Sequence, residues 1–169
     1  MNRLLVSNGL ILDPVTQSVK TSNVYIADGN IIAIDHEPAG FEADRSIDAT
    51  GLIISPGLVD LSARLREPGF DFKADIHSEV TAAASAGITT LCCPPDTDPV
   101  IDEPAVVELI HHKAANAAHT HVVTLGALTR GLEGHLLSEM ATLKAAGCVG
   151  VSNSRRPVAN TLILRRAYS

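Results

Sequence analysis

The chain has 169 residues, of which 46% are hydrophobic, and this is enough for one ordinary globular domain with a core of its own. Its net charge is −6 and no run of lysine or arginine alternates with aromatic residues, so we expect no nucleic-acid partner. No stretch reaches the ~18 apolar residues that a membrane span needs, so we expect no membrane partner. Cys92, Cys93 and Cys148 lack Cys-x-x-Cys spacing, and we expect them to be reduced and buried in a cytoplasmic protein.

Residues 1–54 are predicted to form a β-rich segment of a small sandwich. Short β-prone runs, over residues 4–12, 23–34 and 46–54, alternate with turn residues. The first run is interrupted by Ser-Asn-Gly, so we interpret it as a strand pair rather than a signal peptide. The pair Asp28-Gly29 predicts a hairpin, because both residues tolerate the positive φ of a tight turn.

From residue 55 to residue 169 the pattern changes to strands and helices in alternation, which is typical of parallel βα units. A helix is predicted to begin after Asp75 and to end at Gly87. Its apolar residues Ile76, Val80 and Ala83 share one face, which we expect to be buried. A strand over 89–93 follows it.

Two further helix–strand units are predicted after this strand. Pro104 is expected to open a helix that extends to about residue 117 and leads into a strand over 122–126. The spacing of Leu136, Met140 and Leu143 predicts a third helix, which leads to a strand over 148–151.

This alternation predicts an α/β fold, namely the N-terminal part of a (β/α)8 TIM barrel with about four βα units. A complete barrel takes about 250 residues, so we expect 55–169 to be the first half of a barrel, truncated from a longer polypeptide. Half a barrel leaves open strand edges, which promote association or aggregation, and this too indicates a fragment of a longer polypeptide. We also expect the protein to be oligomeric.

In such barrels the loops that follow the strands lie on one face and carry the chemistry. Three loops of this kind contain the polar, proline and glycine residues that are typical of a site. They are Ser62–Gly69, Pro94–Pro99 and Ser152–Pro157.

The same three loops resemble motifs of the dihydroorotases in the cyclic amidohydrolase superfamily. GLVDLSARLREPG, at 57–69, is similar to the family pattern G-L-V-D-hydrophobic-H-x-H-hydrophobic-R-E-P-G. CCPPDTDPV, at 92–100, resembles M-P-N-T-x-P-V, and GCVGVSNSRRPV, at 147–158, resembles the strand and loop that end in S-D-D-G-x-P-V. The motifs occur in the family order, and the resemblance, which includes a flanking sandwich, covers essentially the whole chain.

The resemblance also implies where the family binds zinc. The two histidines of H-x-H and the first aspartate of S-D-D-G are ligands there, whereas this chain has Ser62, Arg64 and Asn153. A hydroxyl and an amide are poor zinc ligands, and the guanidinium of Arg64 is a protonated group without a lone pair to donate. We therefore expect no zinc cofactor, no metal-activated water and no catalytic residues.

Of two positions that contact substrate in the family, one has the family residue in this chain and the other does not. Arg66 stands where the resemblance implies an arginine that pairs with the dihydroorotate carboxylate. Asp96 stands where the family has an asparagine, and its charge would repel the same carboxylate. We interpret both as vestigial substrate-binding positions, and Arg66 has Asp60, Asp96 or another carboxylate as alternative partners.

The remaining histidines are weaker candidates for a site. His119-Thr120-His121 is a second H-x-H, but it lies at the N-terminal end of a predicted strand, on the face of a barrel that serves stability. His111 and His112 lie late in a predicted helix, where imidazoles complement the helix dipole. We expect neither group to bind a metal.

The resemblance implies a noncatalytic dihydroorotase homologue that acts as a structural subunit in the assembly of aspartate carbamoyltransferase, in pyrimidine biosynthesis. The expected partner is the aspartate carbamoyltransferase catalytic chain. An alternative is an active metal-dependent cyclic amidohydrolase, a dihydroorotase with a rearranged metal site. A third hypothesis is a ligand-sensing module in which Arg66 holds an anion of the pyrimidine pathway.

Overall fold

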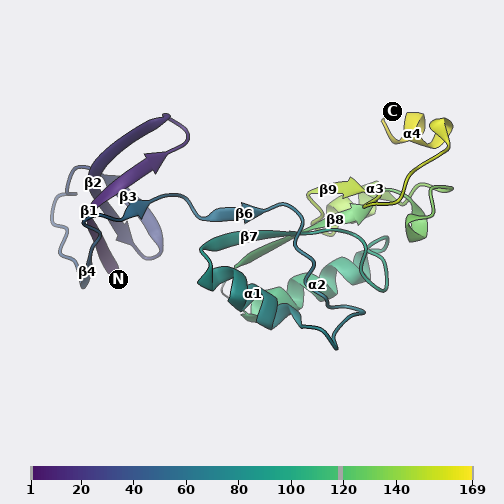
Figure 1. The fold of residues 1–169 in the computed structure, drawn as a ribbon, viewed down its shortest axis with the longest axis horizontal. Coiled ribbons are helices and arrows are strands. Elements are labelled where there is room, and N and C mark those ends of the chain that lie inside the picture. The colour runs from purple at the N-terminus through teal and green to yellow at the C-terminus, as the bar shows by residue number, and fades with distance from the viewer. Residues whose placement is uncertain (1, 118–119, 169) are drawn as a thin grey trace. The chain divides into compact units, whose positions relative to one another are not determined.

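The computed structural model describes residues 2–117 and 120–168. The chain divides into two compact units, Met1–Pro56 and Gly57–Ser169. The first contains a mixed sheet, with antiparallel and parallel pairings, and the second a parallel sheet with helices (Figure 1). None of the helices in the described part of the chain is long and apolar enough to cross a membrane.

The first unit is built around one long strand. β1 pairs antiparallel with β2, while β4 and β5 both pair parallel with β1. The predicted hairpin joins β2 to β3, and its turn residues Asp28 and Gly29 have φ of 49° and 80°. The strands are β1 (Arg3–Asp13), β2 (Ser18–Ala27), β3 (Asn30–Ile34), β4 (Arg45–Asp48) and β5 (Ile53–Ile54).

The prediction of a strand pair at the start of the chain is wrong, because β1 is a single strand. Its register with β2 shifts between Val6 and Gly9, and Asn8 adopts a φ of 61° there. A bulge of this kind absorbs the Ser-Asn-Gly interruption without ending the strand. A Cβ on Gly9 would clash with the side chain of Ile54, so glycine allows β5 to lie against β1.

The second unit is a four-stranded parallel sheet in the order β6-β7-β8-β9, which confirms the predicted half-barrel. Helices α1 and α2 lie along one side of this sheet (Figure 1). The strands are β6 (Leu58–Asp60), β7 (Ile88–Cys93), β8 (His121–Ala127) and β9 (Gly150–Ser152). The helices are α1 (Ile76–Ser85), α2 (Pro104–Ala117), the 3₁₀ helix η1 (Arg130–Leu132), α3 (Met140–Ala145) and α4 (Thr161–Ala167).

Helix α1 has the ends and the buried face that its sequence predicts. Asp75 caps it, accepting a 2.7 Å hydrogen bond from the backbone nitrogen of Ser78. Gly87, with a φ of 79°, follows its last turn. Ile76, Val80 and Ala83 are all buried.

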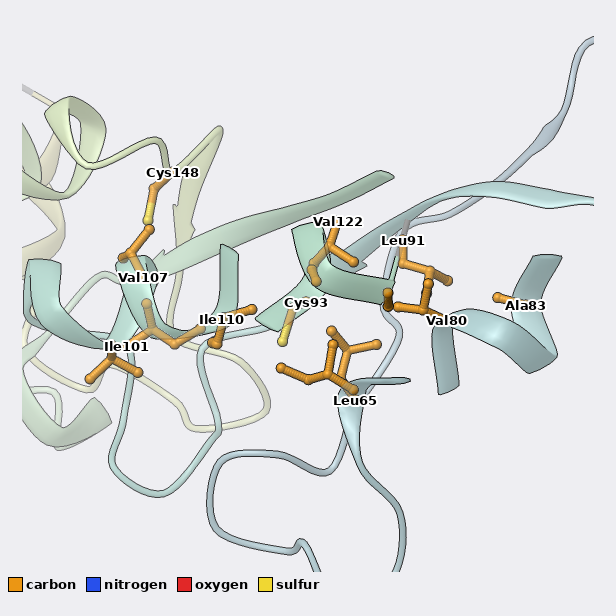
Figure 2. Packing of buried hydrophobic residues seen from close by; sticks show 14 of the residues in the cluster. Leu65, Val80, Ala83, Leu91, Cys93, Ile101, Val107, Ile110, Val122 and Cys148 are labelled. Carbon is orange, nitrogen blue, oxygen red and sulfur yellow. The ribbon is translucent and has the colours of Figure 1, made fainter. Parts of the chain in front are cut away.

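The core of this unit fills the space between the helices and the sheet (Figure 2). Val80 of α1, Ile110 of α2 and Val122 of β8 belong to it. Leu65, from the loop after β6, is 1% exposed and joins the same cluster. Burial of this leucine fixes the middle of that loop against the core.

The third helix is shorter than predicted. It begins at Met140, whereas Leu136 lies outside any helix and is 57% exposed. The segment before α3 contains η1 and two glycines with positive φ, Gly131 and Gly134. Because those backbone conformations are incompatible with an α-helix, the apolar spacing that includes Leu136 belongs to an irregular connection.

Candidate functional site at the carboxyl ends of the strands

Three loops follow the carboxyl ends of parallel strands and hold every candidate residue at the positions of the family motifs. Loop 1 is residues 61–75 after β6, loop 2 is residues 94–103 after β7, and loop 3 is residues 153–160 after β9. In a barrel, such loops gather on one face.

The backbone of loop 1 is hydrogen-bonded to the end of β7 and to loop 2. The nitrogen of Ala63 donates to the carbonyl of Cys92, at the end of β7, over 3.0 Å. The nitrogen of Asp98 donates to the carbonyl of Pro68 over 3.3 Å. The side chains between these two points are therefore held in a defined arrangement.

Arg64 of loop 1 forms an ion pair with Asp96 of loop 2. Its Nε and Nη2 atoms lie 3.0 and 2.8 Å from the same oxygen, Oδ2 of Asp96. The two side chains are only 28% and 29% exposed. Because solvent is partly excluded, the attraction between the two charges is screened less than in a fully exposed pair. A fixed cation thus occupies the second position of the H-x-H motif.

Asn153 of loop 3 also has its polar atoms committed to the protein. Its Oδ1 accepts a 2.6 Å hydrogen bond from Oγ1 of Thr129, and its Nδ2 donates to the carbonyl of Arg156 over 3.0 Å. Thr129 is completely buried and also accepts a 2.9 Å bond from the nitrogen of Gly134. This threonine follows β8, whose loop carries no family motif, and it was not singled out in the sequence.

Ser62, the third altered position, is exposed at the start of loop 1. Its backbone nitrogen donates to Oδ1 of Asp60 over 2.8 Å, so the carboxylate at the end of β6 shapes the turn. Ser62, Arg64 and Asn153 are therefore all on loops at the carboxyl ends of the strands. Arg64 and Asn153 each contact a residue of another loop, whereas the contact of Ser62 lies within its own turn.

Arg66 is exposed and has a φ of 66°. Within residues 2–117 and 120–168 its side chain forms no ion pair. Of the alternative partners considered for it, Asp96 pairs with Arg64 instead, and Asp60 accepts from Ser62. Arg66 lines a cavity of about 250 Å³ between loops 1 and 2, together with Arg64 and Asp96.

Glu67 is a structural residue of loop 1 whose role the motif alone did not predict. It is 7% exposed, its Oε2 accepts from the nitrogen of Ile76 over 3.1 Å, and its Oε1 forms an ion pair with Lys113 of α2. The hydrogen bond to Glu67 raises the pKa of Lys113. This carboxylate therefore anchors loop 1 to the first two helices.

The three cysteines are free and buried, as predicted. Burial raises the pKa of the Cys93 thiol to about 12, and it also raises the pKa of Cys92 and of Cys148. Thiols of this kind are poor nucleophiles and poor metal ligands at neutral pH.

The second H-x-H lies at the amino end of β8. His119 is outside the described residues, Thr120 is buried with its hydroxyl on the carbonyls of Val80 and Ile88, and His121 opens the strand. No group of three His, Cys, Asp or Glu side chains in the described part of the chain is arranged to hold a metal ion.

The fold is that of a known class of (β/α) barrels. The L-hydantoinase from Arthrobacter aurescens superposes with a TM-score of 0.78 and 21% identity, over 99% of this chain and 38% of that one. A crystal structure of a dihydroorotase gives a TM-score of 0.55 over 89% of this chain and 42% of that one. These likenesses show the small β-sheet unit followed by the parallel half-barrel.

Sequence comparison identifies the family within that class. Residues 51–165 match the family described as Dihydro-orotase-like. A dihydroorotase-like protein of Pseudomonas aeruginosa is 47% identical over 157 residues, and a dihydroorotase of Syntrophotalea carbinolica is 41% identical over 165. The chain belongs to the dihydroorotase-like family. It covers 37% and 39% of the length of these two relatives.

Proposed function

We propose that this chain belongs to a noncatalytic dihydroorotase homologue, which acts as a structural subunit in the assembly of aspartate carbamoyltransferase. The observation that carries the noncatalytic part is the ion pair between Arg64 and Asp96. It puts a cation with no lone pair at a position where the family resemblance implies a zinc ligand.

The residues at the three ligand positions do not fit a zinc ion. The guanidinium of Arg64 repels a dication, and Asn153 uses its oxygen to accept from Thr129. Ser62 offers only a neutral hydroxyl. We accordingly propose that the protein has no zinc cofactor and no catalytic residue of the hydrolytic kind, because the metal-activated water of that mechanism has no place to form.

The structural role is supported by the kind of relatives that the chain has. The relatives in Pseudomonas aeruginosa and Pseudomonas putida carry the name dihydroorotase-like protein rather than dihydroorotase. The resemblance to bacterial chains that lack the metal ligands and accompany aspartate carbamoyltransferase supplies the partner, namely its catalytic chain. In this proposal the barrel is retained as a rigid scaffold for an oligomer.

The full-length protein tests both parts of the proposal. Metal analysis should find far less than one zinc per chain, and a dihydroorotate assay should show no turnover, beside an active dihydroorotase as the positive control. Co-expression with the carbamoyltransferase catalytic chain should yield one co-eluting complex that is larger than either protein alone. Stoichiometric zinc with turnover would contradict the noncatalytic part, and separate elution would contradict the structural part.

A further inference from the structure

Loop 1 presents two aromatic rings that nothing in the described structure buries. Phe70 and Phe72 are two of the three phenylalanines in the chain, and they are 39% and 81% exposed. Their ring centroids lie 6.4 Å apart. The third, Phe41, is 9% exposed and packs edge-on against Tyr25. Exposed aromatic pairs are unusual on a surface without a partner, and they are enriched where proteins bind each other.

The backbone that carries these rings is held in place. The nitrogen of Phe70 donates to the carbonyl of Arg66 over 2.7 Å, and the nitrogen of Lys73 donates to the carbonyl of Phe70 over 2.8 Å. Gly69 packs so closely on loop 2 that an added Cβ would lie 2.5 Å from Cβ of Asp98. A preformed loop loses little conformational entropy when it binds, so the two rings are suited to act as anchors.

Charges of both signs lie near the rings. The exposed Asp71, between them in the chain, accepts a 2.9 Å hydrogen bond from the nitrogen of Gly69, and Lys73 follows Phe72. The Nζ atom of Lys73 is 5.4 Å from the centroid of each ring. Lys73 also lines the 250 Å³ cavity with Arg64, Arg66 and Phe70. Among the described lining residues the only carboxylate is Asp96, which is paired with Arg64. In a chain with a net charge of −6, this cavity is therefore locally positive and suited to a carboxylate.

The position of Phe72 indicates which class of ligand carries that carboxylate. It does not line the cavity, yet it is the more exposed of the two rings. A small anion inside the cavity would leave the ring of Phe72 exposed to water, whereas a peptide would cover both the cavity and this ring. Loop 1 also lies at the carboxyl end of β6, the strand end at which the loops of barrel proteins bind their ligands.

We propose that Arg66, Phe70, Phe72 and Lys73 form a docking surface for an acidic segment of a partner protein. A carboxylate of that segment enters the cavity lined by Arg66 and Lys73, and a neighbouring apolar side chain packs on Phe72. The inference rests on the proposed function, because the partner there is the carbamoyltransferase catalytic chain.

The first test uses the full-length protein and that catalytic chain. Phe72→Ser and Lys73→Glu should each weaken the dissociation constant of the complex by about tenfold or more. The controls are Val15→Ser and Lys144→Glu, which change an exposed valine of the first unit and the exposed lysine of α3. The dissociation constants of these two control variants should stay within about twofold of the wild-type value. Added salt should weaken the wild-type complex more than that of Lys73→Glu. Unchanged affinity in both loop-1 variants would overturn the inference.

A second test separates this surface from the identity of the partner. A synthetic peptide that alternates glutamate and leucine should bind the full-length protein, and Lys73→Glu or replacement of its glutamates by glutamine should abolish the binding. If the catalytic chain does not bind at all, the proposed function is wrong. The peptide experiment alone then tests whether the docking surface binds an acidic segment. No peptide binding would then overturn it.

Two further outcomes would also overturn the docking surface. The first is a fall in the melting temperature of the isolated full-length Phe72→Ser protein, which would mean that its own chain covers the ring. The second is binding of N-carbamoyl aspartate that Lys73→Glu abolishes while the protein complex is unaffected, which would make the cavity a metabolite site.

Discussion

Two nitrogen atoms of Arg64 share one oxygen of Asp96, so the other carboxylate oxygen is left over. The shared atom is Oδ2, with donor distances of 3.0 and 2.8 Å. The remaining atom, Oδ1, is buried and has no hydrogen-bond partner among the described residues. Arg64 thus compensates the free-energy cost of holding the charged Asp96 carboxylate in a partly buried place between loops 1 and 2.

Arg64→Ala should therefore destabilise the protein by more than a surface substitution does. Asp96 would keep its charge in a partly buried place without its partner, at a cost of about 1–2 kcal/mol in the free energy of unfolding. Urea unfolding of Arg64→Ala, Asp96→Ala and the double variant measures the coupling between the two residues, which we expect to be about 1 kcal/mol. Strict additivity of the two single changes would show that the pair contributes nothing.

Thr129→Val should destabilise the chain although the two side chains have similar shapes. The change removes the donor to Asn153 and the acceptor for the nitrogen of Gly134, in a place where Thr129 is fully buried. We expect a loss of about 1–3 kcal/mol in the free energy of unfolding. Thr81→Val is a matched control, because Thr81 is exposed on α1, and it should change stability by less than about 0.5 kcal/mol.

Stability should decrease as the pH falls below the ordinary histidine pKa of 6.5, partly because of His111. Burial, and secondarily the nearby His121, lower the pKa of this histidine. The unfolded chain then binds a proton at a higher pH than the folded chain does, so its contribution to stability is complete above 6.5 and is lost as the pH falls from there toward the lowered folded value. Urea midpoints at about pH 7.5 and pH 5.5 measure this loss.

His111→Gln should make that pH dependence smaller, because the titrating group is gone. His36→Gln, at an exposed position in the first unit, serves as the control and should leave the slope as in the wild type. An identical slope in the wild type and in His111→Gln would contradict the assignment.

Cys93 should resist alkylation in the folded protein. Burial raises its pKa to about 12, so at pH 8 only about one thiol in ten thousand is ionised. Iodoacetamide followed by mass spectrometry should find position 93 unmodified under native conditions and modified in urea, with Cys93→Ser as the reference for peptide assignment. Rapid modification of the native protein would mean that this part of the core opens readily.

The sequence predicts those parts of the fold that depend on neighbouring residues. The cap at Asp75 and the end at Gly87 follow from local backbone chemistry, and the predicted buried face of α1 is the observed one. The prediction fails where an unusual φ intervenes, as at Asn8 in the bulge of β1 and at Gly131 before α3. At Asn8 the strand continues through an interruption that the sequence suggested would end it, and at Gly131 the apolar spacing continues where the helix does not.

For the candidate site, too, the sequence predicts some properties and not others. The family motifs place Ser62, Arg64 and Asn153 on loops that follow parallel strands, which is where the structure has them. The partners of those side chains could not be predicted, because Asp96 and Thr129 are 32 and 24 residues away from the groups that they bind. Such pairings depend on which loops come into contact in the folded chain, and the spacing of residues along the sequence does not contain that information.

Together, the two hydrogen bonds of Asn153 need its amide group as it stands. Asn153→Asp would place a carboxylate oxygen against the carbonyl of Arg156, where the amide now donates over 3.0 Å. Two acceptors would then face each other, so loop 3 would have to rearrange before the new carboxylate could bind a metal. A metal site engineered at these positions would thus need changes in loop 3 together with changes at Ser62 and Arg64, and Asn153→Asp alone would lower stability without supplying a usable ligand.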